Sequence, residues 1–140
     1  MKQFIERLDV STRGKGLYEI TGEIASWLGA KPISEGILTV FVQHTSASLL
    51  IQENADPDVT YDLNLFFSRL VVEDNRLYRH TVEGRDDMPA HIRAALTATQ
   101  LSIPIVEGRM ALGRWQGVYL FEHRSMAQHR HVVLHLLGEE

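Results

Sequence analysis

Short runs of β-branched and aromatic residues, each bounded by turn-forming residues, recur along this chain of 140 residues. The run at residues 37–42 begins after Gly36, and the run at residues 45–51 follows it almost at once. Runs of this length are typical of buried strands and are shorter than an ordinary helix. The sequence therefore predicts a sheet assembled from short strands.

Helices are predicted where apolar residues recur at three and four positions instead. A short amphipathic helix begins at Thr21 as its N-cap, a second follows Asp56 and Pro57, and a third has Pro89 in its first turn. Further strands are predicted at residues 4–10, 101–106, 110–112, 117–122 and 131–137. Because no linker or internal repeat separates these elements, residues 1–140 are expected to form a single α+β domain with two to three helices and a mixed or antiparallel sheet.

Charge and composition exclude several classes of function. The formal net charge is −4, from 14 basic and 18 acidic residues, so no broad basic surface is available for nucleic acid. No apolar run has the length of a membrane span or a signal peptide, so we expect a cytoplasmic protein without a membrane partner. The chain has no cysteine, and a bound metal must therefore use nitrogen and oxygen ligands.

The first candidate site lies around His44, between two predicted strands, where a rigid scaffold presents functional side chains. The alternative is a hydrogen-bonded core histidine. Glu53 follows within one strand's length and offers an acid–base group, although helix capping explains carboxylates at this place equally well. Asp56 is best interpreted as a pure cap.

The second candidate is more specific, because His80 and His91 bracket Asp86 and Asp87 at the start of a predicted helix. Free backbone N–H groups and the helix dipole at such a place favour an anionic substrate. Capping by either aspartate, with His91 exposed, is the alternative. If the imidazoles converge with one carboxylate, three protein ligands and an open position make a Lewis-acid site.

Three further residues complete the candidate pocket. Trp115 offers a flat apolar surface for a substrate to pack against, and Gln116 offers an amide that can hydrogen-bond it. The alternative for Trp115 is a buried structural tryptophan. Arg130 offers a bidentate clamp for an anionic group. The histidines nearby in the sequence are expected to be solvated turn residues: His123, His129 and His131.

Several motifs in one order make the chain resemble a known family. These motifs are His44-Thr45-Ser46-Ala47-Ser48, Glu53-Asn54-Ala55-Asp56, Tyr78-Arg79-His80, Asp86-Asp87-Met88-Pro89-Ala90-His91-Ile92, Leu112-Gly113-x-Trp115-Gln116 and Gly138-Glu139. Together they resemble the YjbQ-like family, also called secondary thiamine-phosphate synthases. The resemblance implies a β-sandwich-like sheet arrangement, a homotrimer, and a metal site with His44, His80 and His91 as ligands. In the fifth of these motifs, Arg114 stands where the family commonly has a threonine, directly before the tryptophan.

The function that these observations predict is a metal-assisted enzyme acting on a small phosphorylated metabolite. The resemblance implies a weak or secondary thiamine-phosphate synthase activity, which joins a pyrimidine pyrophosphate to a thiazole phosphate and releases pyrophosphate. Glu53 or Asp87 is then the acid–base group, and Trp115, Gln116 and Arg130 bind substrate. Imidazole ligands favour zinc or another transition metal, with magnesium as the alternative suited to pyrophosphate. The alternative function is a metal- or metabolite-binding protein without physiologically important catalysis.

Overall fold

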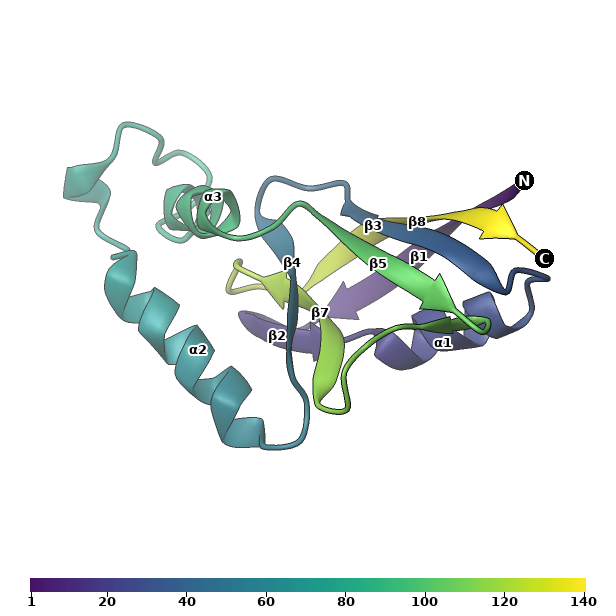
Figure 1. Cartoon of the computed structure of the whole chain (residues 1–140). Helices are drawn as coiled ribbons and strands as arrows, with labels where there is room; N and C mark the ends of the chain where they lie inside the picture. Colours follow the sequence, from purple (N-terminus) through teal and green to yellow (C-terminus); the bar gives the residue numbers. More distant parts are fainter.

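The computed structural model describes the whole chain, Met1–Glu140. Figure 1 shows its strands and helices, whose order along the chain is β1 (Lys2–Thr12), β2 (Gly16–Glu19), α1 (Thr21–Gly29), β3 (Glu35–Val42), β4 (Ala47–Glu53), α2 (Pro57–Leu70), the 3₁₀ turn η1 (Asn75–Leu77), α3 (Asp87–Leu96), β5 (Gln100–Val106), β6 (Arg109–Met110), β7 (Gln116–Glu122) and β8 (Gln128–Glu139).

The strands form two sheets in which every neighbouring pair is antiparallel. Five strands make the larger sheet, in the order β1-β8-β3-β5-β6, and three make the smaller one, in the order β2-β7-β4. Three of the four strand pairs in the larger sheet join segments distant in sequence, and the first strand pairs with the last from Lys2 opposite Gly138 to Thr12 opposite Gln128. The α+β class and the antiparallel sheet predicted from the sequence are confirmed.

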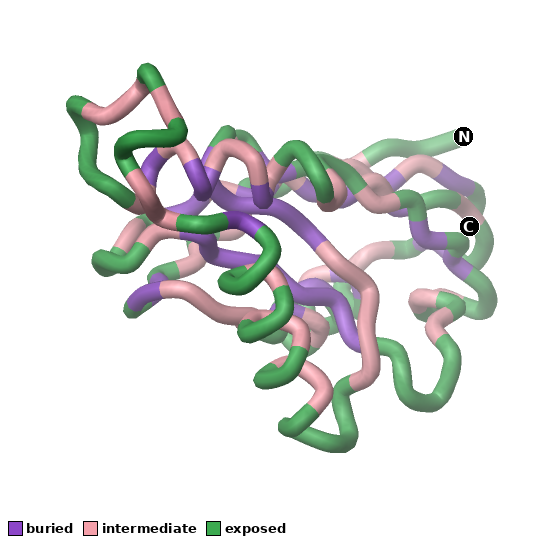
Figure 2. Tube along the Cα trace, turned by 90° about the vertical axis from the view of Figure 1, so that its left-hand side faces the viewer, coloured by how far each residue is buried: buried purple, intermediate pink, exposed green.

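The core lies between the two sheets and α1. Side chains alternate across a strand, so one face of β3, carrying Leu38 and Val40, is buried while the other is not. Helix α1 contributes Ile24 and Leu28, which are 0% and 3% exposed. Figure 2 shows the buried segments gathered in the middle of the molecule, with exposed loops around them. This core fixes the strand ends on which the candidate site is built.

Helices α2 and α3 lie on the side of β4, away from α1 (Figure 1). Helix α2 begins as predicted, because the Asp56 carboxylate accepts a hydrogen bond from the Asp58 amide at 2.9 Å and Pro57 occupies the first helical position. Helix α3 packs its buried face, including Ala90 and Arg93, toward β4. The two helices therefore frame one end of the smaller sheet.

Two local elements differ from the sequence predictions, because contacts with distant parts of the chain determine their structure. Residues 16–19, within or just after an expected loop, form β2 because they pair with β7. The predicted cap Thr21 is wrong, since Ile20 holds the N-cap position and the Thr21 hydroxyl accepts a hydrogen bond from the Val118 amide at 2.8 Å. None of the helices is both long and apolar enough to cross a membrane.

Candidate metal centre

Asp87 is the centre of a cluster formed by the segment that leads into α3 and by that helix's first turns. One carboxylate oxygen, Oδ2, lies 2.7 Å from His80 Nε2 and 3.0 Å from His91 Nε2. Asp87 and His91 stand four residues apart on the helix and therefore share a face. With Glu83, the possible ligand atoms of these residues all lie within 4.8 Å of one another. His80 and His91, two of the three histidines expected as ligands, therefore lie together around Asp87, and their role as metal ligands stays a prediction.

The hydrogen bonds of His91 fit a metal ligand. Its Nδ1 lies 2.9 Å from the Thr45 carbonyl oxygen, which can only accept, so Nδ1 carries a hydrogen. In the neutral ring, Nε2 then points a lone pair at the Asp87 oxygen, and the two acceptors repel unless a proton or a metal cation lies between them. Ligating histidines commonly donate their second N–H to a backbone carbonyl in this way. Two imidazole nitrogens and carboxylate oxygens suit a transition metal.

Arg124, at the turn after β7, holds the carboxylates in place. Its Nη1 donates to Asp87 Oδ1 at 2.7 Å, its Nε donates to Asp86 Oδ2 at 2.9 Å, and its Nη2 donates to the Glu83 carbonyl. Burial opposes ionisation of Asp87, yet hydrogen bonds from His80 and Glu83 and the charge of Arg124 outweigh it and lower the pKa of this carboxyl. Asp87 is thus kept as a carboxylate, the form that binds a cation. No motif links Arg124 to this cluster, because the residue lies 37 positions from Asp87.

His44 is not brought into this cluster within the chain. Its Nε2 accepts a hydrogen bond from the His131 amide at 2.8 Å, its Nδ1 lies 3.3 Å from Arg130 Nη1, and its ring stacks on that of His131. Burial and the nearby charges of Arg130 and His131 lower the pKa of His44. Of the three histidines expected as ligands, His44 therefore stands apart, and Asp87 occupies the third position beside the other two.

Arg130 is a buried structural residue in this structure and does not reach the cluster. It is 4% exposed, and its guanidinium donates to both oxygens of Glu122, at 2.8 and 2.5 Å, and to the carbonyl and hydroxyl oxygens of Ser46. Glu122 is fully buried and also accepts from Thr12 at 2.7 Å. The interior carboxylate of Glu122 therefore already binds the guanidinium that was expected to clamp a substrate anion, and that substrate role stays a prediction.

A second buried network was missed at the sequence level. His123, expected in a solvated turn, is 0% exposed, with Nδ1 accepting from Arg93 Nε at 3.1 Å and Nε2 lying 2.8 Å from the Ser48 hydroxyl. Arg93 is 1% exposed and has no carboxylate partner, but donates to Asn64 Oδ1 at 2.7 Å. Burial, followed by the charges of nearby cations, lowers the pKa of His123 to about 3. This network ties α3, and with it His91, to the smaller sheet and α2.

Glu53, Trp115 and Gln116 gather at the other end of β4. Glu53 pairs with Gln116 in the sheet, and its Oε2 accepts from the Asp56 amide at 3.3 Å. The Gln116 side chain closes its own loop by accepting from the Gly113 amide at 2.7 Å, and Trp115 is 52% exposed. The structure therefore does not bring these three residues to the histidine cluster of the same chain. Their roles as acid–base and substrate-binding groups stay predictions.

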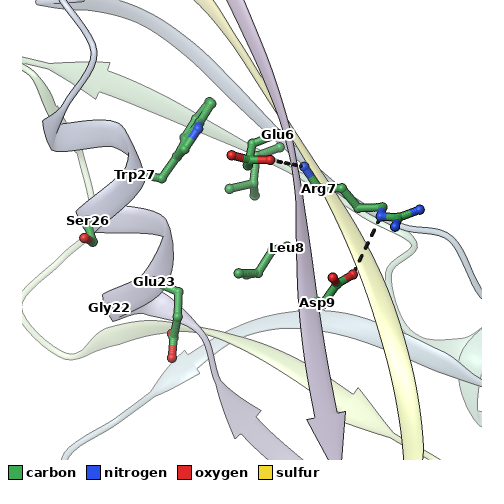
Figure 3. A pocket seen from close by; sticks show the side chains of 9 residues that line it. Glu6, Arg7, Leu8, Asp9, Gly22, Glu23, Ser26 and Trp27 are labelled. Carbon is green, nitrogen blue, oxygen red and sulfur yellow. Dashed lines mark hydrogen bonds and ion pairs between the residues drawn. The ribbon is translucent and has the colours of Figure 1, made fainter.

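The largest groove of the molecule lies elsewhere, between β1 and α1 (Figure 3). It has a volume of about 660 Å³ and is lined by Leu8 and Trp27, with Glu6 and Glu23 at its edges. No histidine lines it, and it therefore offers none of the imidazole donors found around Asp87.

The sequence matches the model of a family described as UPF0047 protein YjbQ-like over residues 6–139. The chain belongs to this YjbQ-like family. It is 54% identical over 138 residues to the UPF0047 protein sll1880 of Synechocystis sp., covering 99% of this chain and 94% of the relative. It is 42% identical over 133 residues to the UPF0047 protein YjbQ of Escherichia coli O157:H7, covering 94% and 96%.

Solved structures share the fold. A yjbq/upf0047 family protein of Clostridium acetobutylicum superposes with a TM-score of 0.86 at 32% identity, covering 94% of this chain and 99% of that one. A protein of Sulfolobus solfataricus P2, described as YbjQ-like and of unknown function, superposes with a TM-score of 0.85 at 21% identity, covering 99% and 100%. The YjbQ-like fold predicted from the sequence motifs is thereby confirmed.

Proposed function

We propose that this YjbQ-like protein is a metal-assisted enzyme acting on a small phosphorylated metabolite. Its ion would be bound by His80, Asp87 and His91, with Glu83 beside them. The observation that carries the proposal is the placement of two imidazole nitrogens around one oxygen of Asp87, while Thr45 fixes the hydrogen of His91 on the opposite nitrogen. A preformed arrangement of this kind lowers the cost of binding a cation.

The donor atoms indicate the class of metal. Two nitrogens with carboxylate oxygens favour zinc or another transition metal over magnesium, which prefers oxygen ligands and retains several waters. When bound, such an ion supplies Lewis acidity toward a phosphate or pyrophosphate oxygen. The chain's own contribution is to keep Asp87 ionised through Arg124 and to hold His91 in one tautomer.

For the reaction, we propose the weak thiamine-phosphate synthase activity that the family resemblance implies, with another phosphorylated metabolite as the native substrate. In that reaction a pyrimidine pyrophosphate and a thiazole phosphate form thiamine phosphate and release pyrophosphate. The growing negative charge on the leaving pyrophosphate requires a cation near it. The cluster is the place in the chain where a bound cation would meet this requirement. We further propose a cytoplasmic homotrimer as the working form.

A second candidate is a metal- or metabolite-binding protein without significant turnover. One observation favours it. Within a single chain, Glu53 lies at the far end of β4. The carboxylates beside His80 and His91 are those of Glu83 and Asp87, which would themselves bind the ion. No further acid–base group of the predicted set then stands free beside the cluster. The two candidates share the same metal site and differ in whether product forms.

Metal content and thiamine-phosphate formation, measured on the same preparations, test the proposal. We expect His80→Ala, Asp87→Asn and His91→Ala to lose most bound zinc and all product formation. His135→Ala is the matched control, because this histidine contacts Gln3 on the outer face of β8 and should keep both properties. Full metal and activity in all three variants contradict the site. Metal loss without product from any preparation, the parent included, favours the second candidate.

A further inference from the structure

His44 lies in the loop between β3 and β4, and both of its ring nitrogens face N–H donors. Nε2 lies 2.8 Å from the backbone nitrogen of His131, and Nδ1 lies 3.3 Å from Arg130 Nη1. A backbone amide only donates, so Nε2 keeps its lone pair and the ring is not doubly protonated. The single hydrogen of the neutral ring is therefore on Nδ1. Burial, followed by the charges of Arg130 and His131, lowers the pKa of His44 and favours this neutral form.

The Nδ1–H group of His44 and the Nη1–H group of Arg130 consequently form a pair of donors without an acceptor. The other nitrogens of Arg130 are occupied, because Nε and Nη2 donate to Glu122 and Nη2 also donates to Ser46. The only partner of Nη1 in the chain is His44 Nδ1, which itself carries a hydrogen. Arg130 is 4% exposed, and a buried donor without an acceptor is unfavourable. Two such neighbouring donors fit an anionic oxygen that accepts from both.

A hollow at the surface lies along the loop that carries His44. It has a volume of about 460 Å³ and is lined by residues 41–46 and Thr99. None of these residues is acidic, so no carboxylate of the lining repels an anion. The nearest buried carboxylate, that of Glu122, binds the Nε and Nη2 edge of the guanidinium and leaves Nη1 to His44. The hollow is therefore suited to a negatively charged group.

The hollow adjoins the histidine cluster through Thr45. This residue lines the hollow, and its carbonyl oxygen accepts the hydrogen bond from His91 Nδ1 at 2.9 Å. Figure 1 shows the loop from β3 to β4 beside α3, the helix that carries Asp87 and His91. Because successive Cα atoms are only about 3.8 Å apart, His44 and the cluster are close enough to contact two groups of one small molecule.

We infer that His44 Nδ1 and Arg130 Nη1 form an oxyanion subsite, which binds a phosphate group of the substrate while the ion at Asp87 contacts another part of the same molecule. The inference rests on the proposed function for the identity of the anion, but the pair of donors does not depend on that function. His44 is then a hydrogen-bond donor to the substrate and not the metal ligand that the family resemblance implies. Its Nε2 is taken up by the His131 amide and its Nδ1 carries a hydrogen, so neither nitrogen is free for an ion.

The tautomer of His44 is the first measurement. Long-range proton–nitrogen correlation NMR on nitrogen-labelled protein shows which ring nitrogen carries the hydrogen, and the spectrum of His44→Asn identifies the signals of this ring. We expect the hydrogen on Nδ1 at neutral pH. A hydrogen on Nε2, or a doubly protonated ring, overturns the inference, because the pair of donors then lacks its geometry.

Inorganic phosphate, titrated into metal-free protein and followed by the amide shifts of Thr45 and Ser46, tests the subsite without the ion. We expect saturable binding, beyond the effect of sodium chloride at the same ionic strength. His44→Phe should weaken it roughly tenfold or more, since a hydrogen bond to a charged group is lost. His44→Asn keeps an N–H group near the place of Nδ1 and should stay within about threefold of the parent. His129→Ala, which removes an exposed histidine beside Arg130 in sequence, is the matched control and should bind as the parent does.

The outcomes separate this subsite from the metal site. Absence of saturable binding, or equal phosphate affinity in the parent and His44→Phe, overturns the inference. Binding that appears only after zinc is added also overturns it and leaves the metal site in place. The expected effects of the variants in a protein that takes up no zinc support the subsite and remove the proposed function instead.

Discussion

Replacing Arg130 by methionine should destabilise the fold, because the change leaves the Glu122 carboxylate buried without its charged partner. Glu122 is 0% exposed and receives two hydrogen bonds from Arg130, at 2.8 and 2.5 Å. After the substitution it keeps only the Thr12 hydroxyl and the backbone amides of His123 and Arg124. Removing one partner of a buried ion pair costs about 3–5 kcal/mol.

Urea unfolding and thermal unfolding, both followed by circular dichroism, measure this cost. At a change in Tm of about 4 °C per kcal/mol for a chain of this size, Arg130→Met should melt about 12 to 20 °C below the parent, and its urea midpoint should fall as well. Arg114→Met, at an exposed position, is the matched control and should change stability by no more than about 0.5 kcal/mol. The double variant Glu122→Leu/Arg130→Met should recover part of the loss, since no unpaired charge remains.

A different result would favour the substrate role that the sequence predicts for Arg130. If Arg130→Met unfolds at the same urea concentration as the parent but binds pyrophosphate less tightly, the guanidinium is a ligand for substrate and the structural interpretation is wrong.

Three further outcomes are expected. His123 titrates near pH 6.5 when unfolded but has a pKa of about 3 when folded, so the unfolded state takes up its proton first. As the pH falls from about 6.5 toward 3, the free energy of unfolding of the parent should therefore fall by up to about 1.4 kcal/mol per pH unit relative to that of His123→Gln. If urea unfolding at pH 6 and at pH 4 gives the same change in this free energy for both proteins, the ring of His123 is not buried in its neutral form. Asp56→Ala removes the cap of α2 and should cost about 1 kcal/mol in the same assay, whereas Asp56→Asn should cost less. Gly138→Ala places a methyl group against the backbone of Glu35 and Gly36, so it should cost about 1–3 kcal/mol, and a neutral result would show that β3 and β8 can separate there.

Local signals made part of the molecule predictable. Helix α2 begins where Asp56 and Pro57 indicate, because capping and the fixed backbone angle of proline act within one turn. Asp87 and His91 lie within one predicted helix start, and their spacing of four residues brings the two side chains to one face of α3. His80 joins them from only seven residues before Asp87, so a short segment contains this part of the site.

The rest depends on contacts between distant segments. Arg130 reaches Ser46 across 84 residues, and Arg93 reaches His123 across 30, so no spacing in the sequence shows that these polar side chains are buried together. Sequence spacing likewise did not show that Glu53 lies away from the histidine cluster. Nearness to His44 in sequence suggested one site, but the intervening strand β4 is extended and carries Glu53 to its far end.

An anomalous difference map of crystals soaked in cobalt, collected at the cobalt edge, shows whether His80, Asp87 and His91 bind one transition-metal ion. We expect one strong peak per protomer within about 2.0–2.2 Å of His80 Nε2, Asp87 Oδ2 and His91 Nε2. A peak at His44 or at the outer histidines of β8, with none beside Asp87, would show that the ion binds elsewhere.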